Sequence, residues 1–459
     1  MSPRNRFPTP SRQFVIALAM LTLVSTASAE WKEKVVYSFQ GGTNDGSVPA
    51  GGVVFDKQGN LYGATTGGGP ASCAPVGSEC GTVFELSPGA KGKWTETVIY
   101  RFQGEASQDG SVPNGGLIID AAGNLYGVTA YGGTGDCFLV GVKAGCGTVY
   151  EVSPPNQKDG AWTETILYSF PTSRQGYLPN GDLVFDSTGN LYGATAFGGT
   201  KGTTCDSYYG GQCGVVFELS PPKTKGGKWM EAVLHNFAGG SDGETPNGGL
   251  VLNTTGAVYG TTPTGGNQLC NFGNGNVGCG IVFELTRPGK KDGAWIEKIL
   301  HRFTKGNDGA GPNGGLILDA KGSLYGTAGD GGSGEGLGVV FGLTQSQNGK
   351  WGERILYSFQ GGSDGRNPAA PLSSDSYGKL YGTTSWGGTD LGGTLFRLDL
   401  RAGTWDFHIL YSFSRSPNAE FPTYRLVFDG AGNLYGATQN GGTGQACQGG
   451  CGTVFEVKP

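Results

Sequence analysis

Short apolar segments alternate with clusters of glycine, proline, asparagine and aspartate along most of the chain. The pattern is clearest in residues 94–152, where WTETVIYRF, GGLIID, NLYGVT and GTVYEV follow one another. All four segments are rich in Val, Ile, Thr, Tyr and Phe, which favour strands over helices. GGLIID (115–120) is apolar without alternation, as expected for a strand that is covered on both faces. The sequence therefore predicts four short strands per unit.

The same four segments occur seven times. Each copy begins with a tryptophan in the same context, successive copies are 54 to 68 residues apart, and only Trp386 lies outside this series. The link D-x-x-G-N between the second and third segments is typical of a tight turn, because Asp forms turns and Gly tolerates a positive φ. Asn253 is the sole substitute for that Asp. The seven tryptophans are Trp31, Trp94, Trp162, Trp229, Trp295, Trp351 and Trp405.

Seven four-stranded units predict an all-β fold, a seven-bladed β-propeller whose antiparallel blades surround a central channel. A solenoid is the main alternative for so regular a repeat. The presence of four strands in each unit favours the propeller.

The order of the segments predicts how the ring closes. If GGLIID is innermost, each blade ends with the Trp segment of the next copy, and the seventh blade lacks an outer strand. We therefore expect residues 31–39 to pair with residues 452–457. Alternate connections of a meander emerge on one side, so the loops between NLYG and GTVF should share a face with the DGxxPNGG loops between blades. This long-loop face is the expected ligand surface.

The VLYSF-like strand, the DGxxPNGGL segment, D-x-x-G-NLYGAT-x-GG and GTVFEL resemble the GloVer (Gloeo/Verruco) tandem repeat of exported bacterial proteins, over nearly all of residues 31–457. The resemblance implies an exported protein, often displayed at the cell surface, and implies no particular activity. The order Leu-Tyr, Gly-Gly, Val-Phe, Trp is also similar to kelch repeats, which implies a propeller.

Residues 1–29 have the layout of a signal peptide. Three arginines precede an 11-residue apolar run at 14–24, and Ala27, Ser28 and Ala29 form an A-x-A cleavage site. The run is too short to span a bilayer, which takes about 20 apolar residues. We expect cleavage after Ala29, a single seven-repeat propeller domain over residues 30–459, and a secreted or periplasmic protein.

Net charge and composition exclude some classes of binding partner. A net charge of −5 and a pI near 5.4 provide no basic footprint for nucleic acid. The 89 glycines lack a G-X-Y period, so they indicate turns and not collagen. We expect a monomer without a membrane span, cofactor or metal, whose partner is an extracellular glycan or protein.

The ten cysteines form five close pairs, each in a loop between an NLYG segment and a GTVF segment. Export makes local disulfides the expected state. A zinc site would need four ligands at one point, whereas these pairs belong to different copies. The pairs are Cys73/Cys80, Cys137/Cys146, Cys205/Cys213, Cys270/Cys279 and Cys447/Cys451.

Few residues qualify as catalytic groups. His235 and His301 replace the tyrosine of the VLYSF strand and His408 holds a variable position, so packing or exposed histidines explain all three. The Glu two residues after most of the seven repeat tryptophans, such as Glu96, should pair between strands rather than form the close carboxylate pair of a glycosidase. The Asp before Gly in five inter-blade loops, such as Asp109, suits turn capping, with cation binding as the alternative. We predict no catalytic residue.

Departures from the repeat are better candidates for ligand binding. The second Gly of GGLIID is Asp182 in the third copy and Arg425 in the seventh. Both should contact a polar ligand at the channel mouth, unless repeat decay left them in channel water. Before the Gly-Gly doublet, Tyr131, Phe197 and Trp386 suit stacking on sugar rings, or else packing beneath the disulfide loops.

These observations predict a secreted, non-enzymatic propeller that binds a glycan or surface protein on its long-loop face. A carbohydrate-active enzyme, either a polysaccharide lyase or a hydrolase, and a structural component of the envelope are the alternatives. The lack of a His and carboxylate cluster outside the repeat argues against an enzyme.

Overall fold

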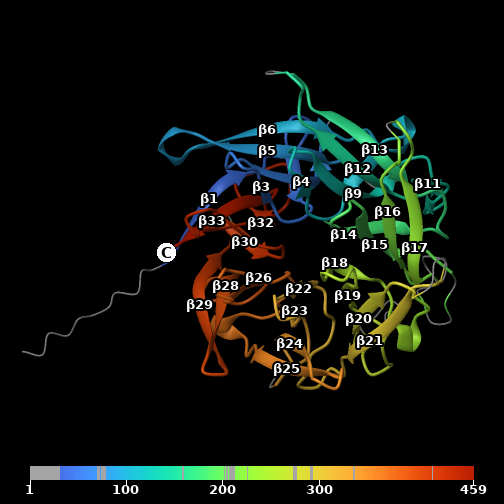
Figure 1. Ribbon diagram of the computed structural model, residues 1–459. Helices are drawn as coiled ribbons and strands as arrows, with labels where there is room; N and C mark the ends of the chain where they lie inside the picture. The colour runs from blue at the N-terminus through green and yellow to red at the C-terminus, as the bar shows by residue number, and fades with distance from the viewer. Residues whose placement is uncertain are drawn as a thin grey trace, which may run out of the picture. The chain divides into compact units, whose positions relative to one another are not determined.

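Three segments of each copy and the Trp segment of the next copy form one antiparallel sheet, and the seven sheets surround a central channel as the blades of a β-propeller (Figure 1). The computed structural model describes residues 31–459 except 70–72, 74–78, 158–159, 201, 203–204, 206–211, 225, 272–276, 290–292, 334–335 and 416. The predicted all-β, seven-bladed propeller is confirmed. The expected signal peptide lies outside the described residues.

The first three blades each begin with a strand at the channel and continue outward. Blade 1 consists of β2 (Gly46–Pro49) with β3 (Val54–Phe55), then β4 (Leu61–Gly68), β5 (Thr82–Pro88) and β6 (Trp94–Arg101). Blade 2 consists of β7 (Gly110–Pro113) with β8 (Ile118–Ile119), then β9 (Leu125–Gly132), β12 (Thr148–Ser153) and β13 (Thr163–Ser169). Blade 3 consists of β14 (Tyr177–Phe185), β15 (Leu191–Phe197), β16 (Val215–Ser220) and β17 (Met230–Asn236).

The last four blades follow the same order. Blade 4 consists of β18 (Asn247–Leu252), β19 (Val258–Thr262), β20 (Ile281–Thr286) and β21 (Ile296–Arg302). Blade 5 consists of β22 (Leu316–Leu318), β23 (Leu324–Ala328), β24 (Val339–Gln345) and β25 (Trp351–Ser358). Blade 6 consists of β26 (Ser373–Ser374), β27 (Leu380–Thr384), β28 (Leu391–Arg401) and β29 (Thr404–Ser414). Blade 7 consists of β30 (Ala419–Pro422) with β31 (Val427–Phe428), then β32 (Leu434–Gly441), β33 (Thr453–Lys458) and β1 (Lys32–Ser38).

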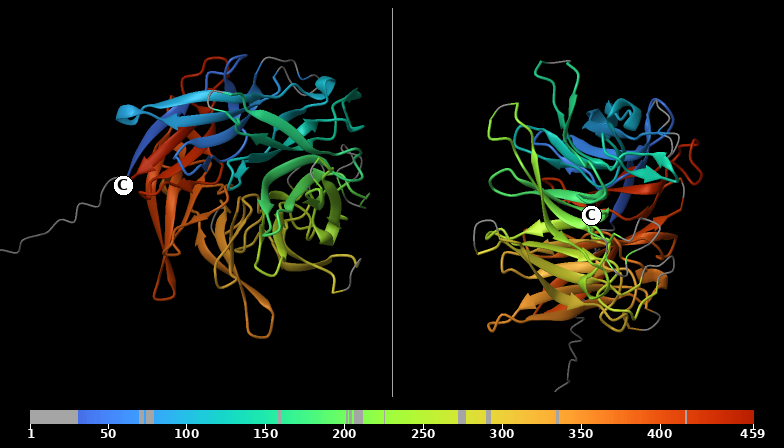
Figure 2. Two further views of the ribbon diagram at one scale, coloured as in Figure 1. Left: turned by 45° about the horizontal axis from the view of Figure 1, so that its top comes forward. Right: turned by 90° about the vertical axis from the view of Figure 1, so that its right-hand side faces the viewer.

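The ring closes as the sequence predicts. Strand β1 pairs antiparallel with β33, from Lys32 opposite Lys458 to Ser38 opposite Thr453. Figure 1 shows the blue β1 beside the red β33, and Figure 2 shows the blades from two other sides. The first strand of the described chain is therefore the outer edge of the last blade, which rules out a linear solenoid.

Aromatic pairs fill the spaces between blades. The phenylalanine that follows each VLYSF-like strand is fully buried, and it meets an aromatic ring of the next blade edge to face, with centroids 5.0 to 5.3 Å apart. Each such pair adds about 0.5–1.5 kcal/mol to the gain from burial. The same interface is thus built seven times, from the pairs Phe39–Phe84, Phe102–Tyr150, Phe170–Phe217, Phe237–Phe283, Phe303–Phe341, Phe359–Phe396 and Phe413–Phe455.

The innermost strand differs from the prediction of one continuous GGLIID strand. In blade 2 it consists of β7 and β8, which both pair with β9 and are separated by residues 114–117. The segment predicted as an inter-blade loop therefore supplies half of the innermost strand. In blade 3 one strand spans both halves, with a register shift between Asn180 and Val184. Pro113 and the amide of Asn114 still pair with β9, and the two glycines that follow are outside both strands and line the channel.

A left-handed residue in the innermost strand connects five of the blades to the one before. Val48, Val112 and Leu178 have φ near +56°, a strained value for bulky side chains, and the equivalent residues of the other blades share it. This conformation turns the amide of Val112 toward the preceding blade, where it donates to the carbonyl of Cys80 at 2.8 Å. Equivalent bonds join Val48 to Cys451, Thr245 to Cys213, Gly311 to Cys279 and Asn367 to Leu337.

The next residue is a proline that packs on a glycine of the preceding blade. Gly147, the Gly of GTVY, has φ +98°, and a Cβ there would lie 2.5 Å from Pro179 Cδ and 2.5 Å from Thr129 O. The last blade contacts the first in the same way, because a Cβ on Gly452 would lie 2.4 Å from Pro49 Cδ. Glycine is therefore required at this position by both backbone conformation and space.

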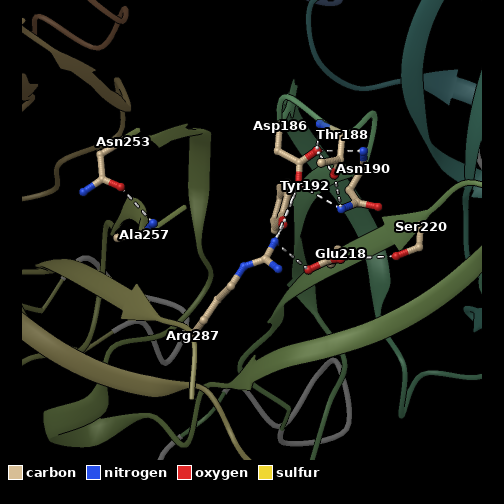
Figure 3. A network of polar contacts seen from close by, with 9 residues as sticks. All are labelled: Asp186, Thr188, Asn190, Tyr192, Glu218, Ser220, Asn253, Ala257 and Arg287. Atoms are coloured by element: carbon tan, nitrogen blue, oxygen red, sulfur yellow. Dashed lines mark hydrogen bonds and ion pairs between the residues drawn. The ribbon is translucent and has the colours of Figure 1, made fainter. Parts of the chain in front are cut away.

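Capped turns form the face opposite the cysteine loops. In D-x-x-G-N, one Asp oxygen accepts from the backbone amides two and four residues later, as Asp186 does from Thr188 and Asn190 at 2.8 and 3.0 Å. Arg287 of blade 4 reaches this turn, with Nη2 2.5 Å from Tyr192 Oη and 3.5 Å from Asp186 Oδ2 (Figure 3). Burial alone would raise the pKa of Asp186, but the hydrogen bonds from Thr188 and Asn190 outweigh it and lower the pKa. The turn is thus tied to the next blade by a charged contact.

All five expected disulfides are present. The Cys73–Cys80 bridge lies against the inter-blade loop, since a Cβ on Gly104 would be 2.6 Å from Cys73 Sγ. Inside the Cys137–Cys146 bridge, β10 (Phe138–Leu139) and β11 (Val142–Lys143) form a small hairpin. The cysteine loops and the inter-blade loops therefore share one face, as predicted.

Substitution at the glycine–proline contact tests how much the contact contributes to the free energy of unfolding. Gly147→Ala adds a Cβ that clashes with Pro179 and also incurs the cost of a positive φ. Gly189→Ala is the matched control, because Gly189 has φ +87° and nothing within 4 Å of its added Cβ. We expect Gly189→Ala to cost about 1–2 kcal/mol of unfolding free energy and Gly147→Ala about 1–3 kcal/mol more. Denaturant titration of both variants measures the difference, and equal losses would contradict a role for the contact.

Candidate functional site

The channel contains a polar cavity of about 390 Å³ that is lined by the P-N-G-G residues of the innermost strands. Each innermost strand begins at the cysteine-loop face, as the pairing of Gly110 with Gly132 shows, and the lining residues follow a few positions later. The cavity therefore lies toward the cysteine-loop side of the channel. Its asparagine side chains come from four consecutive blades, namely Asn114, Asn180, Asn247 and Asn313.

Asp182 and Arg425 both line this cavity, from blades 3 and 7. The Asp182 carboxylate accepts a hydrogen bond from the amide of Gly116 at 2.7 Å. Backbones are crowded at this level: a Cβ on Gly52 would lie 2.8 Å from Arg425 O, and one on Gly51 would lie 2.1 Å from Gly116 N. Small residues at the equivalent positions allow this contact, so two charged side chains can share the channel with glycines.

Three buried polar atoms of the lining residues have no hydrogen-bond partner among the described residues. They are Nε of Arg425, Oδ1 of Asn180 and Oγ1 of Thr423. The wall as a whole contains asparagine and glutamine amides, a carboxylate and a guanidinium. The cavity therefore offers both hydrogen-bond donors and acceptors to a molecule inside it.

The sequence analysis missed two further residues of the cavity wall, Tyr424 and Gln439. Tyr424 stands where most copies have glycine; its hydroxyl donates to Pro49 O at 2.7 Å and accepts from Gln439 Nε2 at 2.6 Å. Burial raises the pKa of Tyr424 to about 12, so it stays protonated at neutral pH. Two features of the sequence could have indicated the cavity wall: the replacement of a repeated glycine by Tyr424, and the repeated asparagine of P-N-G-G.

A second cavity, of about 400 Å³, adjoins the first and is lined mainly by Val, Leu, Ile and Phe of the innermost strands. The two cavities share Gly52, Gly116, Asp182 and Arg425. The channel is thus polar toward the cysteine loops and apolar toward the capped turns, and the two charged residues stand where the halves meet.

The three candidate aromatic residues lie elsewhere, and none of them lines either channel cavity in the described part of the chain. Tyr131 and Phe197 are partly buried against a core cluster of blades 2 and 3, with the Tyr131 ring 6.2 Å from that of Tyr177. Trp386 is 42% exposed and lies 4.3 Å from the Phe421 ring of the next blade. The structure brings Asp182 and Arg425 to one cavity and leaves the aromatic residues on its periphery.

The Asp of the inter-blade loops caps its turn, as the sequence suggested. Asp109 Oδ2 accepts from the amide of Gln103 at 2.7 Å and from the hydroxyl of Tyr100 at 2.8 Å, while Oδ1 accepts from Gly110 at 2.6 Å. In two blades histidine replaces the tyrosine: His235 Nε2 is 3.3 Å from Asp242 Oδ2, and His301 Nε2 is 3.4 Å from Asp308 Oδ2.

The glutamates that follow the tryptophans have two kinds of neighbour. Glu33 and Glu231 bond Tyr411 and Tyr168 on the outer strand of the neighbouring blade, as the predicted pairing between strands requires. The other four lie beside a loop aspartate, which the sequence analysis did not predict, and burial and then the Asp109 carboxylate raise the pKa of Glu164 to about 8. Burial raises the pKa of all six, and each has a buried Oε1 without a hydrogen-bond partner in the described regions; they are Glu33, Glu96, Glu164, Glu231, Glu297 and Glu353.

A family profile, the Gloeobacter/Verrucomicrobia repeat, matches residues 22–271 and 268–459. The chain belongs to this family. The resemblance inferred from the VLYSF-like, PNGG, NLYG and GTVF segments is confirmed. In this chain, one set of these four segments makes up each blade. Among curated proteins none matches the chain.

Several solved structures have a similar course of the chain. A candidate 6-phosphogluconolactonase from Bacteroides uniformis is 13% identical, with 78% of this chain and 85% of that chain covered and a TM-score of 0.47. PhoX from Pseudomonas fluorescens, in complex with vanadate, is 10% identical, with 94% and 95% covered and a TM-score of 0.45. A Dyadobacter fermentans protein of unknown function is 12% identical, with 93% and 98% covered and a TM-score of 0.43. Similarities this low carry no information about activity.

The described residues contain no helix that is long and apolar enough to cross a membrane. The five disulfides are consistent with an oxidising compartment such as the periplasm or the extracellular space.

The raised pKa of Glu164 predicts a stability that depends on pH. The unfolded chain loses this proton near pH 4.3, whereas the folded protein keeps it to about pH 8. The contribution of Glu164 to the stability of the folded protein is therefore full at low pH and is lost as the pH rises between these two values. Glu164→Gln removes the titration. We expect wild type and variant to melt at similar temperatures at pH 5 and the variant to melt higher at pH 9, as measured by calorimetry.

The exposed Asp390→Asn is the control for a general effect of charge. A Glu164→Gln variant that parallels wild type from pH 5 to 9 would show that Glu164 is ionised throughout in the folded protein.

Proposed function

We propose that this protein is a secreted or periplasmic binding protein that holds a small, hydroxyl-rich ligand, such as the end of a glycan, in the polar cavity of its channel. The observation that carries the proposal is the lining of this cavity, in which amide side chains from five blades stand with the Asp182 carboxylate and the Arg425 guanidinium. A hydrogen bond between a ligand and a charged group of this wall contributes about 1.5–3 kcal/mol.

The chemistry of the wall favours a polyhydroxylated ligand. Asparagine and glutamine amides each donate and accept hydrogen bonds, and so does a sugar hydroxyl. Asp182 and Arg425 contribute one charge of each sign, which favours a neutral or zwitterionic molecule over a strongly charged one. A volume of about 390 Å³ accommodates a mono- or disaccharide at the small end of the usual range for ligand pockets.

The wall supports binding rather than glycoside hydrolysis. Asp182 is the sole carboxylate among the described residues that line the polar cavity, whereas hydrolysis uses a pair. Tyr424 is a poor general base, since its pKa is raised to about 12. The alternative of a carbohydrate-active enzyme therefore lacks its main groups at this site.

Binding of oligosaccharides to the purified protein, measured on a glycan array and then by calorimetry, tests the proposal. Arg425→Gln and Asp182→Asn should each weaken the affinity by about 10- to 100-fold, as expected when a hydrogen bond to a charged group is lost. Arg174→Gln, at an exposed position on an inter-blade loop, is the matched control and should leave the affinity unchanged.

The other outcomes discriminate the alternatives. Unchanged affinity in Arg425→Gln, with loss in Trp386→Ala, would move the site to the loop rim. Turnover of an oligosaccharide that disappears in Asp182→Asn would favour the enzyme. A protein that binds no glycan would favour a role as a structural component of the envelope.

A further inference from the structure

A cluster of one histidine and two carboxylates lies between the outer strands of blades 3 and 4, away from the channel. His235 belongs to β17, Asp242 ends a one-turn 3-10 helix (Gly240–Asp242), and Glu297 belongs to β21. One ligand atom from each lies within 4.8 Å of the other two. Three elements that are separate in sequence thus direct a nitrogen and two oxygens to one point.

The geometry points to a divalent transition-metal site, with zinc as the best-fitting ion, in which His235, Asp242 and Glu297 are the protein ligands. The distance of 3.3 Å between His235 Nε2 and Asp242 Oδ2 agrees with the spacing of two ligands on a tetrahedral metal, which is about 3.4 Å for bonds of about 2.1 Å. Three N and O ligands leave a fourth position for water. The side chains of His235 and Asp242 are 17% and 24% exposed, so this position is accessible from solvent.

The two carboxylates need a cation or a proton between them. Glu297 Oε1 is buried and has no hydrogen-bond partner among the described residues. The nearby Arg302 donates to Ser241 O at 3.3 Å instead of bridging the pair. A metal ion would satisfy both carboxylates at once.

A departure from the repeat distinguishes this position. Five of the seven copies have a tyrosine there, and in three of them its hydroxyl donates to the loop aspartate, as in Tyr37 to Asp45 at 2.9 Å. A neutral imidazole nitrogen is among the commonest metal ligands, whereas a protonated phenol satisfies the aspartate by itself. The amide of Ala238 also donates to Asp242 Oδ2 at 2.7 Å and would hold this ligand in place.

The equivalent cluster in the next blade is arranged differently. His301 Nε2 lies 3.4 Å from Asp308 Oδ2 and 3.6 Å from Glu353 Oε1. The second Asp308 oxygen accepts from the Thr304 hydroxyl at 2.7 Å, which orients this carboxylate within its own loop. This second set is therefore an internal control rather than a second assigned site.

One other group of potential ligands is not available to a metal. Cys205, Cys213 and Glu244 lie close together, but the two sulfur atoms are joined in a disulfide. Thiolates are the cysteine form that binds zinc.

The test is titration of the EDTA-treated, desalted protein with zinc chloride, followed by calorimetry and by metal analysis after dialysis. We expect one zinc ion per chain, and a melting temperature that rises with zinc concentration. His235→Tyr restores the residue of the other blades and Glu297→Gln keeps the shape of the side chain, so both variants should fold. Each should weaken zinc binding by about 100-fold or more, because even residues behind the ligands contribute 10- to 100-fold.

His301→Tyr is the matched control and should keep the stoichiometry and affinity of wild type. Binding that survives both His235→Tyr and Glu297→Gln, or that disappears in His301→Tyr, would overturn the assignment. So would a wild-type protein whose melting temperature does not respond to zinc. Arg425→Gln should bind zinc normally, so the outcome is independent of the proposed ligand cavity.

Discussion

The structure depends on the close approach of each innermost strand to the preceding blade. A left-handed residue turns its amide to the carbonyl at the end of the preceding cysteine loop, and the proline after it packs on a glycine that has no room for a Cβ. The backbone hydrogen bond and the proline–glycine contact across the interface thus offset the conformational strain of the left-handed residue. Because the last blade makes the same contact with Pro49, the interaction closes a ring instead of propagating along a stack.

This constraint also shapes the channel. The left-handed residue interrupts the pairing of the innermost strand, and the N-G-G residues after the proline line the central cavity. Glycines at the most crowded level allow the backbones of neighbouring blades to touch. Asp182 is accommodated there because Gly116 has no side chain and offers its amide to the carboxylate. The elements that hold the ring together therefore also build the polar wall of the cavity.

Much of this architecture could be predicted from the sequence, because it is written in repeated and local patterns. Seven copies of four strand-like segments predicted the ring, the missing outer strand predicted the pairing of β1 with β33, and short cysteine spacings predicted the disulfides. The split of the innermost strand was not predictable. Proline and glycine are typical of loops, and nothing in Gly110–Pro113 indicates that a valine will adopt φ +57° to complete a strand.

The candidate sites were predictable only where one residue departs visibly from the repeat. Asp182 and Arg425 stood out as charges among glycines. Asn180 did not, because its amide is part of the repeated motif and its unsatisfied oxygen is a property of the assembled channel. The neighbours of His235 were equally hidden, since Glu297 comes from the outer strand of the next blade and reaches Asp242 only when the blades pack side by side.

In a ring of seven similar interfaces, one interface can change its chemistry while the others stay the same. Six outer interfaces each place a glutamate where its buried Oε1 has no hydrogen-bond partner within the described residues, while at the seventh position Phe407 stacks on Tyr357 with ring centroids 3.6 Å apart. One interface can therefore lose its carboxyl group while the others keep theirs. The same tolerance allows histidine to replace tyrosine between two blades, and aspartate or arginine to replace glycine at the channel. Since the fold is held by the sum of seven interfaces, a local change of chemistry at one of them costs only part of the total stability. The two proposed sites each include positions at which the repeat symmetry is broken, Asp182 and Arg425 in the channel and His235 at the outer interface.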